Sequence, residues 1–537
     1  MSEQLIEPRV RYEEQIKALP CVSKRTKIYS LSGTVRSGNV ARILLDNYQN
    51  GILETKDCYL NFTCNPVFTG AGIAGAVVST EPAVTARNPE VPSQQVPIYR
   101  NYNTAATLVQ KVEVLVNGVS ICVMDNYNMI AQALAIAGQD PTNSGFRGVT
   151  EGGDGGLTVL EAPPISASTA NATAAAPFNN TKNIGTDFRD IASLQGENFA
   201  YVVGCNVGEA AEYNKLTGKP QTYSLPLHSI LGSCFKNIPL GYLQNSGLEI
   251  QITFEQDGLK SFHTLNPSYP LESVECTFSD IAFDNRINYY EPASMDVIND
   301  LNGWKPGGEP ITWVGEQFKV STGQITVTQQ NATSEFTTLV PNSRYRCLDY
   351  LLYTSFPSTQ KKIGTNVIGG INPWLPFIGV NSLQYRIGAT LHPRSQINTL
   401  SNAVECTKCC LSACSQSLTN TMMCRHGTYL NERQDNLGET GTSARTSDAK
   451  NIQGFNRLFP RGVIGVSTGT FNDDHGCISG TDTSNLTVQC LTSIKPSVAG
   501  ENYVSKTAIA PQTTAWISKI SVAYQLDPNT GRMGVSF

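Results

Sequence analysis

The sequence predicts an all-β protein made of large β-sandwich domains. Its 537 residues contain many short apolar segments separated by Gly, Pro, Asn and Ser, a spacing typical of sandwiches and not of βαβ units. One segment alternates between apolar and polar residues without error, which is the pattern of a half-buried antiparallel strand. Its apolar positions are Leu248, Ile250, Ile252 and Phe254. Because all-β domains often exceed about 200 residues, the length is compatible with two such domains.

Composition and charge narrow the class of protein. Charged residues make up 15% of the chain, below the roughly 25% of typical soluble domains. A low charge is typical of loop-rich β proteins and of surfaces that neighbouring subunits cover. The net charge of -5 argues against a nucleic-acid-binding protein, which needs a basic face to contact phosphates. The small basic cluster Lys24, Arg25 and Lys27 is interpreted as a solvated strand edge.

The N-terminal residues and the cysteines predict where the chain folds. The first residues, MSEQLIEPRVRYEEQ, lack the apolar core of a secretory signal, and no run approaches the roughly 18 apolar residues of a membrane span. We therefore expect synthesis and folding in the cytoplasm. The 15 cysteines should stay reduced there, and Cys122, Cys276 and Cys490 occupy alternating, core-like positions.

The first third of the chain predicts three strand regions and one short helix. Residues 30–38 and 58–68 have strand composition. Residues 111–123 form a hairpin, because Asn117 and Gly118 readily adopt the positive φ angles of a type I′ turn. A helix is predicted within residues 125–139.

That helix is predicted from its periodicity and its ends. Asp125 or Asn126 can cap its start, and Gly138 can end it. Its apolar face consists of Tyr127, Ile130, Ala131 and Leu134.

Two segments predict long exposed loops. Residues 142–182 are rich in Gly, Ala, Ser, Thr and Asn, a composition that cannot bury enough apolar surface to form a core. Residues 435–453 have a similar composition and are the second predicted loop.

The remaining strands place a domain boundary near residue 295. Strands are predicted at residues 199–205 and 248–255, and again from residue 273, where Val274, Cys276 and Phe278 alternate with polar residues. Residues 292–310 are a short polar stretch followed by a Pro/Gly cluster, and a new series of strands follows. These strands are predicted at residues 311–320, 323–330, 346–356 and 515–526, the last with Ile520, Val522, Tyr524 and Leu526 on one face. The predicted divisions are an N-terminal arm (1–23), a first domain (24–295) and a second domain (296–537).

The segment 221–255 carries a family resemblance. Its first half, LPLHSILG followed by IPLGYL, resembles a segment in the first jelly roll of double jelly-roll major capsid proteins, which coat virophages and polinton-like viruses. The resemblance implies two tandem jelly-roll domains with long loops and a few short helices. It also implies structural roles for Pro226, His228, Pro239 and Leu240.

The resemblance has consequences for function. It implies a non-enzymatic capsid subunit that forms a homotrimer, a pseudo-hexagonal capsomer that tiles an icosahedral shell around a DNA genome. Its expected partners are neighbouring capsomers and the penton and minor capsid proteins, with the long loops on the outer side. The arm (1–23) would contact a neighbouring capsomer or an internal virion component. No catalytic, cofactor-binding or metal-binding residue and no sequence-specific nucleic-acid contact is expected, and the protein would be made in the host cytoplasm and reside in the virion.

Two motifs suggest enzymes. Gly70, Gly72 and Gly75 match the GxGxxG turn of dinucleotide-binding folds, but four prolines between residues 82 and 97 prevent the helix that must follow. We interpret these residues as a glycine-rich loop. Gly465, Ser467 and Gly469 match the GxSxG nucleophile elbow of hydrolases.

The GxSxG motif lacks the separate loops that would deliver its catalytic partners. The residues closest to it are Asp473, Asp474 and His475, which follow too soon in the chain to fold around one site. A surface turn is the preferred interpretation.

A cysteine cluster is the most ligand-like group in the sequence. It comprises Cys406, Cys409, Cys410, Cys414, Cys424 and His426. The spacing of Cys406 and Cys409 occurs in zinc sites, but Cys424 and His426 are an unusually tight second pair. The preferred interpretation is a helical or irregular segment with several small buried thiols, and a zinc site or a virion disulfide remains an alternative.

Two other functions were compared with the capsid hypothesis. A β-sandwich attachment or glycan-binding protein would present aromatic side chains in exposed loops, whereas the four tryptophans, Trp304, Trp313, Trp374 and Trp516, occupy strand or turn positions. A β-rich hydrolase would need paired carboxylates or a triad, and no convincing set is present.

Overall fold

The structure is a computed structural model of the chain. It describes residues 20–45, 50–55, 57–70, 98–100, 105–137, 215–217, 220–227, 238–243, 247–264, 272–302, 310–325, 335–357, 380–398, 400–410, 463–468, 480–494 and 512–536. These residues form mainly antiparallel sheets, and none of the described strands pairs with a strand from the other half of the chain. Among the described helices, none has the length and apolar character needed to cross a membrane.

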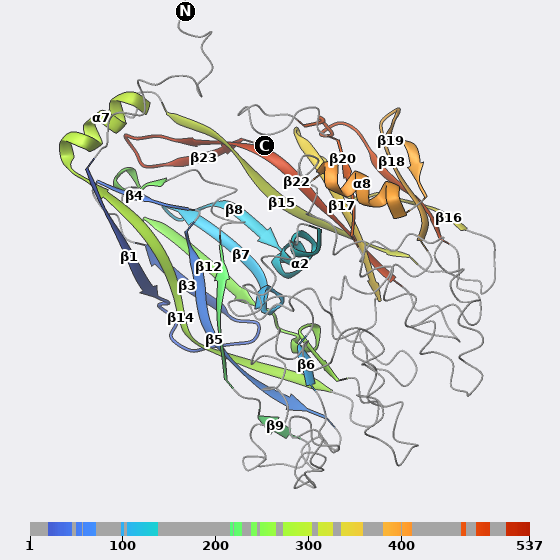
Figure 1. The fold of residues 1–537 in the computed structure, drawn as a ribbon, viewed down its shortest axis with the longest axis horizontal. Coiled ribbons are helices and arrows are strands. Elements are labelled where there is room, and N and C mark those ends of the chain that lie inside the picture. The colour runs from blue at the N-terminus through green and yellow to red at the C-terminus, as the bar shows by residue number, and fades with distance from the viewer. Residues whose placement is uncertain are drawn as a thin grey trace, which may run out of the picture.

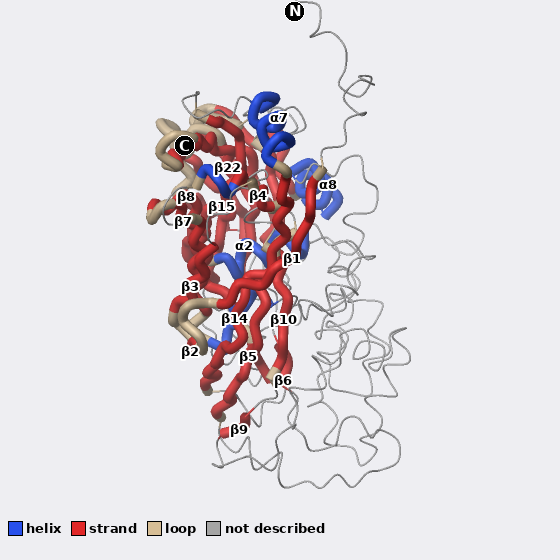
Figure 2. Tube along the Cα trace, turned by 90° about the vertical axis from the view of Figure 1, so that its left-hand side faces the viewer, coloured by secondary structure: helices blue, strands red, loops and turns tan. Residues whose placement is uncertain are grey.

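The first half of the chain contains two main sheets. The larger consists of β1 (Cys21–Tyr29), β2 (Val35–Arg36), β4 (Gly51–Leu53), β5 (Tyr59–Thr69), β9 (Lys215–Thr217), β10 (Gln221–Pro226), β11 (Ile238–Pro239) and β14 (Ser273–Tyr290). The smaller has the order β3 (Val40–Leu45), β12 (Leu248–Phe254), β7 (Val109–Val116) and β8 (Val119–Asp125). A short pair, β6 (Ile98–Arg100) and β13 (Phe262–Thr264), is separate from both. Figure 2 shows β5 and β14 lying side by side along most of their length.

The two main sheets of the first half pack face to face through aromatic side chains. The side chains of β12 alternate between buried and partly exposed as predicted, with Phe254 fully buried. Its ring stacks on Phe278 of β14 with centroids 3.8 Å apart, and it meets Phe62 of β5 edge-on at 5.5 Å. Since these rings come from different sheets, they form the centre of a β-sandwich core.

The second half repeats this arrangement. One sheet has the order β15 (Ile311–Ile325), β22 (Gln512–Leu526), β17 (Leu348–Pro357) and β20 (Ile464–Ser467), with β23 (Met533–Ser536) also paired with β22. The other has the order β16 (Glu335–Leu339), β21 (Val488–Ile494), β18 (Val380–Ile387) and β19 (Thr390–Ile397). Their core contains Tyr353 and Trp516 from the first sheet and Tyr385 and Cys490 from the second, all buried. Burial raises the pKa of Cys490 to about 12.

Three α-helices are described: α2 (Tyr127–Ala137), α7 (Pro292–Asn302) and α8 (Leu400–Cys410). Short 3₁₀ turns occur at Ala105–Leu108, Leu240–Tyr242 and Gly258–Lys260. In Figure 1, α2 lies between the two groups of strands, α7 lies at one end of β14, and α8 lies over the second half. The predicted helix is therefore confirmed at α2, where Asn126 adopts φ 54° before the first turn.

The hairpin prediction is confirmed, and several other strand predictions need correction. Asn117 and Gly118 have φ 51° and 76° between β7 and β8, as a type I′ turn requires. Residues 30–38, predicted as a strand, are mostly turns, because Gly33 (φ 62°) and Gly38 (φ 82°) reverse the chain around the two-residue β2. The strands predicted at 311–320 and 323–330 form one continuous strand as far as Ile325.

Two further differences concern the ends of the first half. β1 begins at Cys21, within the last residues of the predicted arm, and pairs with β14 along its whole length. Residues 292–302, expected to be a polar stretch, form the helix α7, of which Ser294 and Met295 are buried and most other described side chains exposed. The strand predicted at 199–205 and both predicted long loops, 142–182 and 435–453, lie outside the described residues.

Candidate functional site

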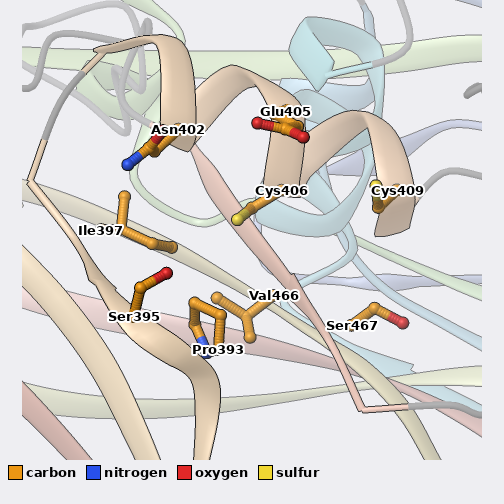
Figure 3. A pocket seen from close by; sticks show the side chains of 9 residues that line it. All are labelled: Pro393, Ser395, Ile397, Asn402, Glu405, Cys406, Cys409, Val466 and Ser467. Atoms are coloured by element: carbon orange, nitrogen blue, oxygen red, sulfur yellow. The ribbon is translucent and has the colours of Figure 1, made fainter.

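A groove on the second half brings the GxSxG motif and the cysteine cluster together. It has a volume of about 320 Å³ and lies between β19, α8 and β20 (Figure 3). Its lining consists of Pro393, Ser395, Ile397, Asn402, Glu405, Cys406, Cys409, Val466 and Ser467. The serine of the GxSxG motif and two thiols of the cysteine cluster therefore face one cavity, although about 60 residues separate them in the chain.

Helix periodicity places the two thiols on the groove. Cys406 and Cys409 are three residues apart on α8 and therefore share a face of the helix. The thiol of Cys406 is half-buried and points into the groove in Figure 3, whereas Cys409 is exposed. Burial, together with the neighbouring Glu405 carboxylate, raises the pKa of the Cys406 thiol. A raised pKa keeps this thiol protonated at neutral pH, which makes it a poor nucleophile.

The serine of the motif lies in a strand and not in a nucleophile elbow. Ser467 is the last residue of β20 and pairs with Tyr350 of β17. The preferred interpretation as a surface turn is therefore wrong for residues 464–467, because backbone pairing with β17 extends this segment into a strand. No histidine and no aspartate lines the described groove. Asp473, Asp474 and His475 lie outside the described residues, and the one carboxylate in the described lining is that of Glu405 on α8.

The first glycine of the motif has a packing role. An added Cβ at Gly465 would lie 2.9 Å from Cys410 Sγ and 3.1 Å from both Leu352 Cδ2 and Thr407 Cα. The backbone N–H of Gly465 also donates a 2.9 Å hydrogen bond to Thr407 Oγ1. Thus α8 approaches β20 so closely that only a residue without a side chain fits at this position.

The cysteine cluster is helical in its described part. Cys410 is buried against β20, and neither Cys406, Cys409 nor Cys410 is in a disulfide. No group of three or more His, Cys, Asp or Glu side chains within the described ranges has a geometry that could hold a metal ion. The remaining members of the cluster, Cys414, Cys424 and His426, lie outside these ranges.

The residues to which the family resemblance assigns structural roles lie in the first half of the chain. Leu240 is buried, and Pro239 pairs with Ile52 of β4, whereas His228 lies outside the described residues. Pro226 ends β10 opposite Tyr59. Of the GxGxxG motif only Gly70 is described, directly after β5.

The tryptophans that are described do not form an exposed aromatic platform. Trp516 is buried in the second core, and Trp313 stacks on Tyr524 with ring centroids 5.8 Å apart. Trp304 and Trp374 lie outside the described residues. The aromatic surface that a glycan-binding protein would need is therefore not built from the two tryptophans that can be placed.

The basic cluster near the N-terminus lies on a strand edge, as predicted. Arg25 forms a 2.7 Å ion pair with Asp284, and its guanidinium lies 5.3 Å from the centre of the Tyr59 ring. The Lys24 ammonium lies over the ring of Tyr289 at 5.3 Å. The contacts of Lys24 and Arg25 attach the edge strand β1 to its own sheet.

An exposed apolar patch lies next to this edge strand. Tyr29 is 64% exposed, Leu31 72% and Val40 41%. The loop that carries Leu31 lies along β3, since Leu31 N–H donates to the carbonyl of Arg42 at 2.9 Å. Exposed large apolar side chains near a sheet edge are candidates for contacts between proteins. We refer to Tyr29, Leu31 and Val40 as the edge patch.

Comparison with known proteins identifies the fold. No protein-family model and no curated protein matches the sequence. The chain is similar in structure to the Sputnik virophage particle solved by cryo-EM, with 11% identity, a TM-score of 0.56, and 99% of this chain and 92% of that chain covered. The mavirus major capsid protein gives 10% identity and a TM-score of 0.51, with 98% of this chain and 93% of that chain covered. The PBCV-1 virus capsid aligns at 12% identity with a TM-score of 0.49, over 97% of this chain and 98% of that chain.

The Sputnik and mavirus neighbours are double jelly-roll major capsid proteins of virophages, so the fold of this chain is two jelly rolls in tandem. The resemblance seen in residues 221–255 and the predicted all-β class are both confirmed at the level of the fold. The order of the sheets agrees with this assignment, because each half of the chain builds its own pair of packed antiparallel sheets.

Proposed function

We propose that this chain is a major capsid protein. Three copies would form a pseudo-hexagonal capsomer, because two similar jelly rolls per chain give six sandwiches around a threefold axis. Such capsomers would tile an icosahedral shell around a DNA genome, with penton and minor capsid proteins as further partners. The observation that carries this proposal is the likeness of nearly the whole chain to virophage capsid proteins that have the same double fold.

The chemistry of the described surface supports a structural role. The described lining of the groove on the second half contains two serines, two thiols and one carboxylate, that of Glu405. Burial and this carboxylate raise the pKa of the adjacent Cys406 thiol, which disfavours a reactive thiolate. Gly465, the glycine of the GxSxG motif that lies within the described residues, allows close packing of α8 on β20. We therefore propose that the protein is not an enzyme and works through its contacts with other subunits.

The edge patch and the edge strand support assembly. β1 is an outermost strand of its sheet, and most of its side chains are exposed on both faces in the single chain. Exposed strand edges bind further chains unless they are covered. A capsomer would cover this edge and the neighbouring apolar side chains, and obligate contacts of this kind bury upwards of about 2,000 Å² per interface.

We further propose the division of the chain into an arm (1–23), a first jelly roll (24–295) and a second jelly roll (296–537). The change of sheet membership between β14 and β15 supports the second boundary. In this proposal the protein is made in the host cytoplasm and resides in the virion. The arm would contact a neighbouring capsomer or an internal virion component.

Light scattering coupled to gel filtration tests the proposal. The expected result is a species near three times 58.1 kDa that persists on dilution. Concentrated samples of that species should form closed shells visible by electron microscopy. A monomer at every concentration, with no particles, would contradict the capsid function and favour an attachment protein.

A further inference from the structure

The second jelly roll covers the open edge of the first. β8 is the last strand of its sheet, so its outer edge has no described strand to pair with. β15 and β23 of the second half run along this edge, as Figure 1 shows. Covering an edge with another part of the chain prevents it from pairing with a foreign strand.

Two side chains of β15 take the place of a backbone ladder on this edge. Gln317 Nε2 donates to the carbonyl of Ile121 at 2.9 Å, and Lys319 Nζ donates to the carbonyl of Val123 at 2.9 Å. The two donor residues are two positions apart on β15, and the two acceptor residues are two positions apart on β8, which matches the two-residue repeat of a β-strand. The two sheets therefore meet in a defined register without merging into one sheet.

The contact continues at both ends of this pair. At the tip of the β7–β8 hairpin, Asn117 Nδ2 donates to the carbonyl of Gly531 at 2.5 Å. On the other side, Met129 of α2 packs against Ala515 and Val320 in a small apolar cluster. The two jelly rolls are thus joined through polar and apolar groups that come from several strands.

The side chain of Gln317 donates two hydrogen bonds but accepts none. Its side chain is fully buried, and Nε2 donates to Tyr524 Oη at 2.8 Å as well as to Ile121. Its Oε1 atom is buried and accepts no hydrogen bond. An unsatisfied buried acceptor lowers stability, so this amide adds little net stability but demands one orientation of its partners.

We propose that Gln317 and Lys319 act as a clasp that sets the orientation of the two jelly rolls. The chain would then enter any assembly as one preformed unit, and two of the six sandwiches of a capsomer would already be in register. This inference rests on contacts within one chain and does not depend on the capsid function.

Hydrogen exchange of the full chain tests the clasp. In the double variant Gln317→Met, Lys319→Met, the unbranched apolar side chains keep the bulk and remove the donors. We expect amides of β8 (residues 119–125) to exchange at least about tenfold faster, while amides of β5 in the centre of the first jelly roll are unchanged. The matched control is Arg42→Met, because Arg42 lies on β3 at the opposite edge of the same sheet and forms a 2.7 Å ion pair with Glu249 of β12. This control should leave β8 exchange at the wild-type rate.

Three results decide the inference. The clasp is supported if the double variant exchanges faster only at the contact between the jelly rolls. It is further supported if the single variant Lys319→Arg, which keeps Gln317 and a cationic donor, exchanges at the wild-type rate. Unchanged exchange in β8 would overturn it, as would an equal rise in β5, which would mean general loss of stability. Hydrogen exchange is measured on unassembled chains, so its result does not depend on whether the protein forms capsids. A chain that never forms trimers can still have a clasp.

Discussion

The substitution Gly465→Ala tests whether the GxSxG motif serves packing or chemistry. The added methyl group would lie 2.9 Å from Cys410 Sγ and 3.1 Å from Thr407 Cα. The second contact is with backbone, so a side-chain rotation cannot relieve it, and α8 must move away from β20. Overpacking of this kind costs about 1–3 kcal/mol, and weakening the hydrogen bond from Gly465 N–H to Thr407 adds about 1 kcal/mol.

Thermal unfolding is the assay for this loss. For a jelly roll of this size, about 2–4 kcal/mol corresponds to a fall in Tm of roughly 4–16 °C. The matched control is Ser467→Ala, two residues away on the same strand, where the side chain is exposed to the groove. This variant should stay within about 0.5 kcal/mol of the wild type.

The two variants separate packing from catalysis. Neither should change the hydrolysis of a test ester such as p-nitrophenyl acetate, which should proceed at the rate seen with any folded control protein. The reasoning is refuted if Gly465→Ala leaves the Tm unchanged. A hydrolysis rate that disappears in Ser467→Ala would refute the non-enzymatic assignment.

Three further predictions concern the core, the thiols and the surface. Phe254→Ala removes a ring that stacks on Phe278 between two sheets, and chemical unfolding should show a loss of about 3–5 kcal/mol; a loss below 1 kcal/mol would mean that this stack is not part of the core. Because burial raises the pKa of Cys490 to about 12, iodoacetamide at pH 8 should label the exposed Cys21 in the folded protein and Cys490 only after unfolding, as peptide mass spectrometry can determine; equal labelling of both would contradict the buried assignment. Leu31→Glu in the edge patch should leave the stability of the single chain within about 0.5 kcal/mol but reduce trimer formation in light scattering, and full assembly of the variant would exclude the patch as an interface.

Local features of the chain could be predicted because local physics decides them. The alternation from Leu248 to Phe254 gives a strand with one buried face whatever the rest of the chain does. Asn117 and Gly118 reverse the chain because both tolerate positive φ. The helix α2 follows from the apolar period of its sequence. Short strands in both halves of the chain, with the Pro/Gly cluster between them, were the basis for predicting an all-β fold with two domains.

Predictions failed where a local signal was weak or ambiguous. Residues 30–38 have strand composition, but the glycines at 33 and 38 take positive φ and turn the chain. The helix α7 is on average much less apolar than α2 and its described side chains are mostly exposed, so composition does not mark it as part of a core. The strand identity of Ser467 depends on pairing with Tyr350, more than 100 residues earlier in the chain.

The sequence by itself determined the class of fold, the main hairpin and the residues of the first core, since side-chain polarity and backbone preference act over a few residues. Only the tertiary structure decided which distant groups meet. It placed Ser467 and Cys406 in the lining of one groove, made Gly465 a packing residue, and joined Gln317 to Ile121 across the two jelly rolls. The spacing of residues in the sequence does not predict these contacts, because each depends on how elements formed by separate parts of the chain pack against one another.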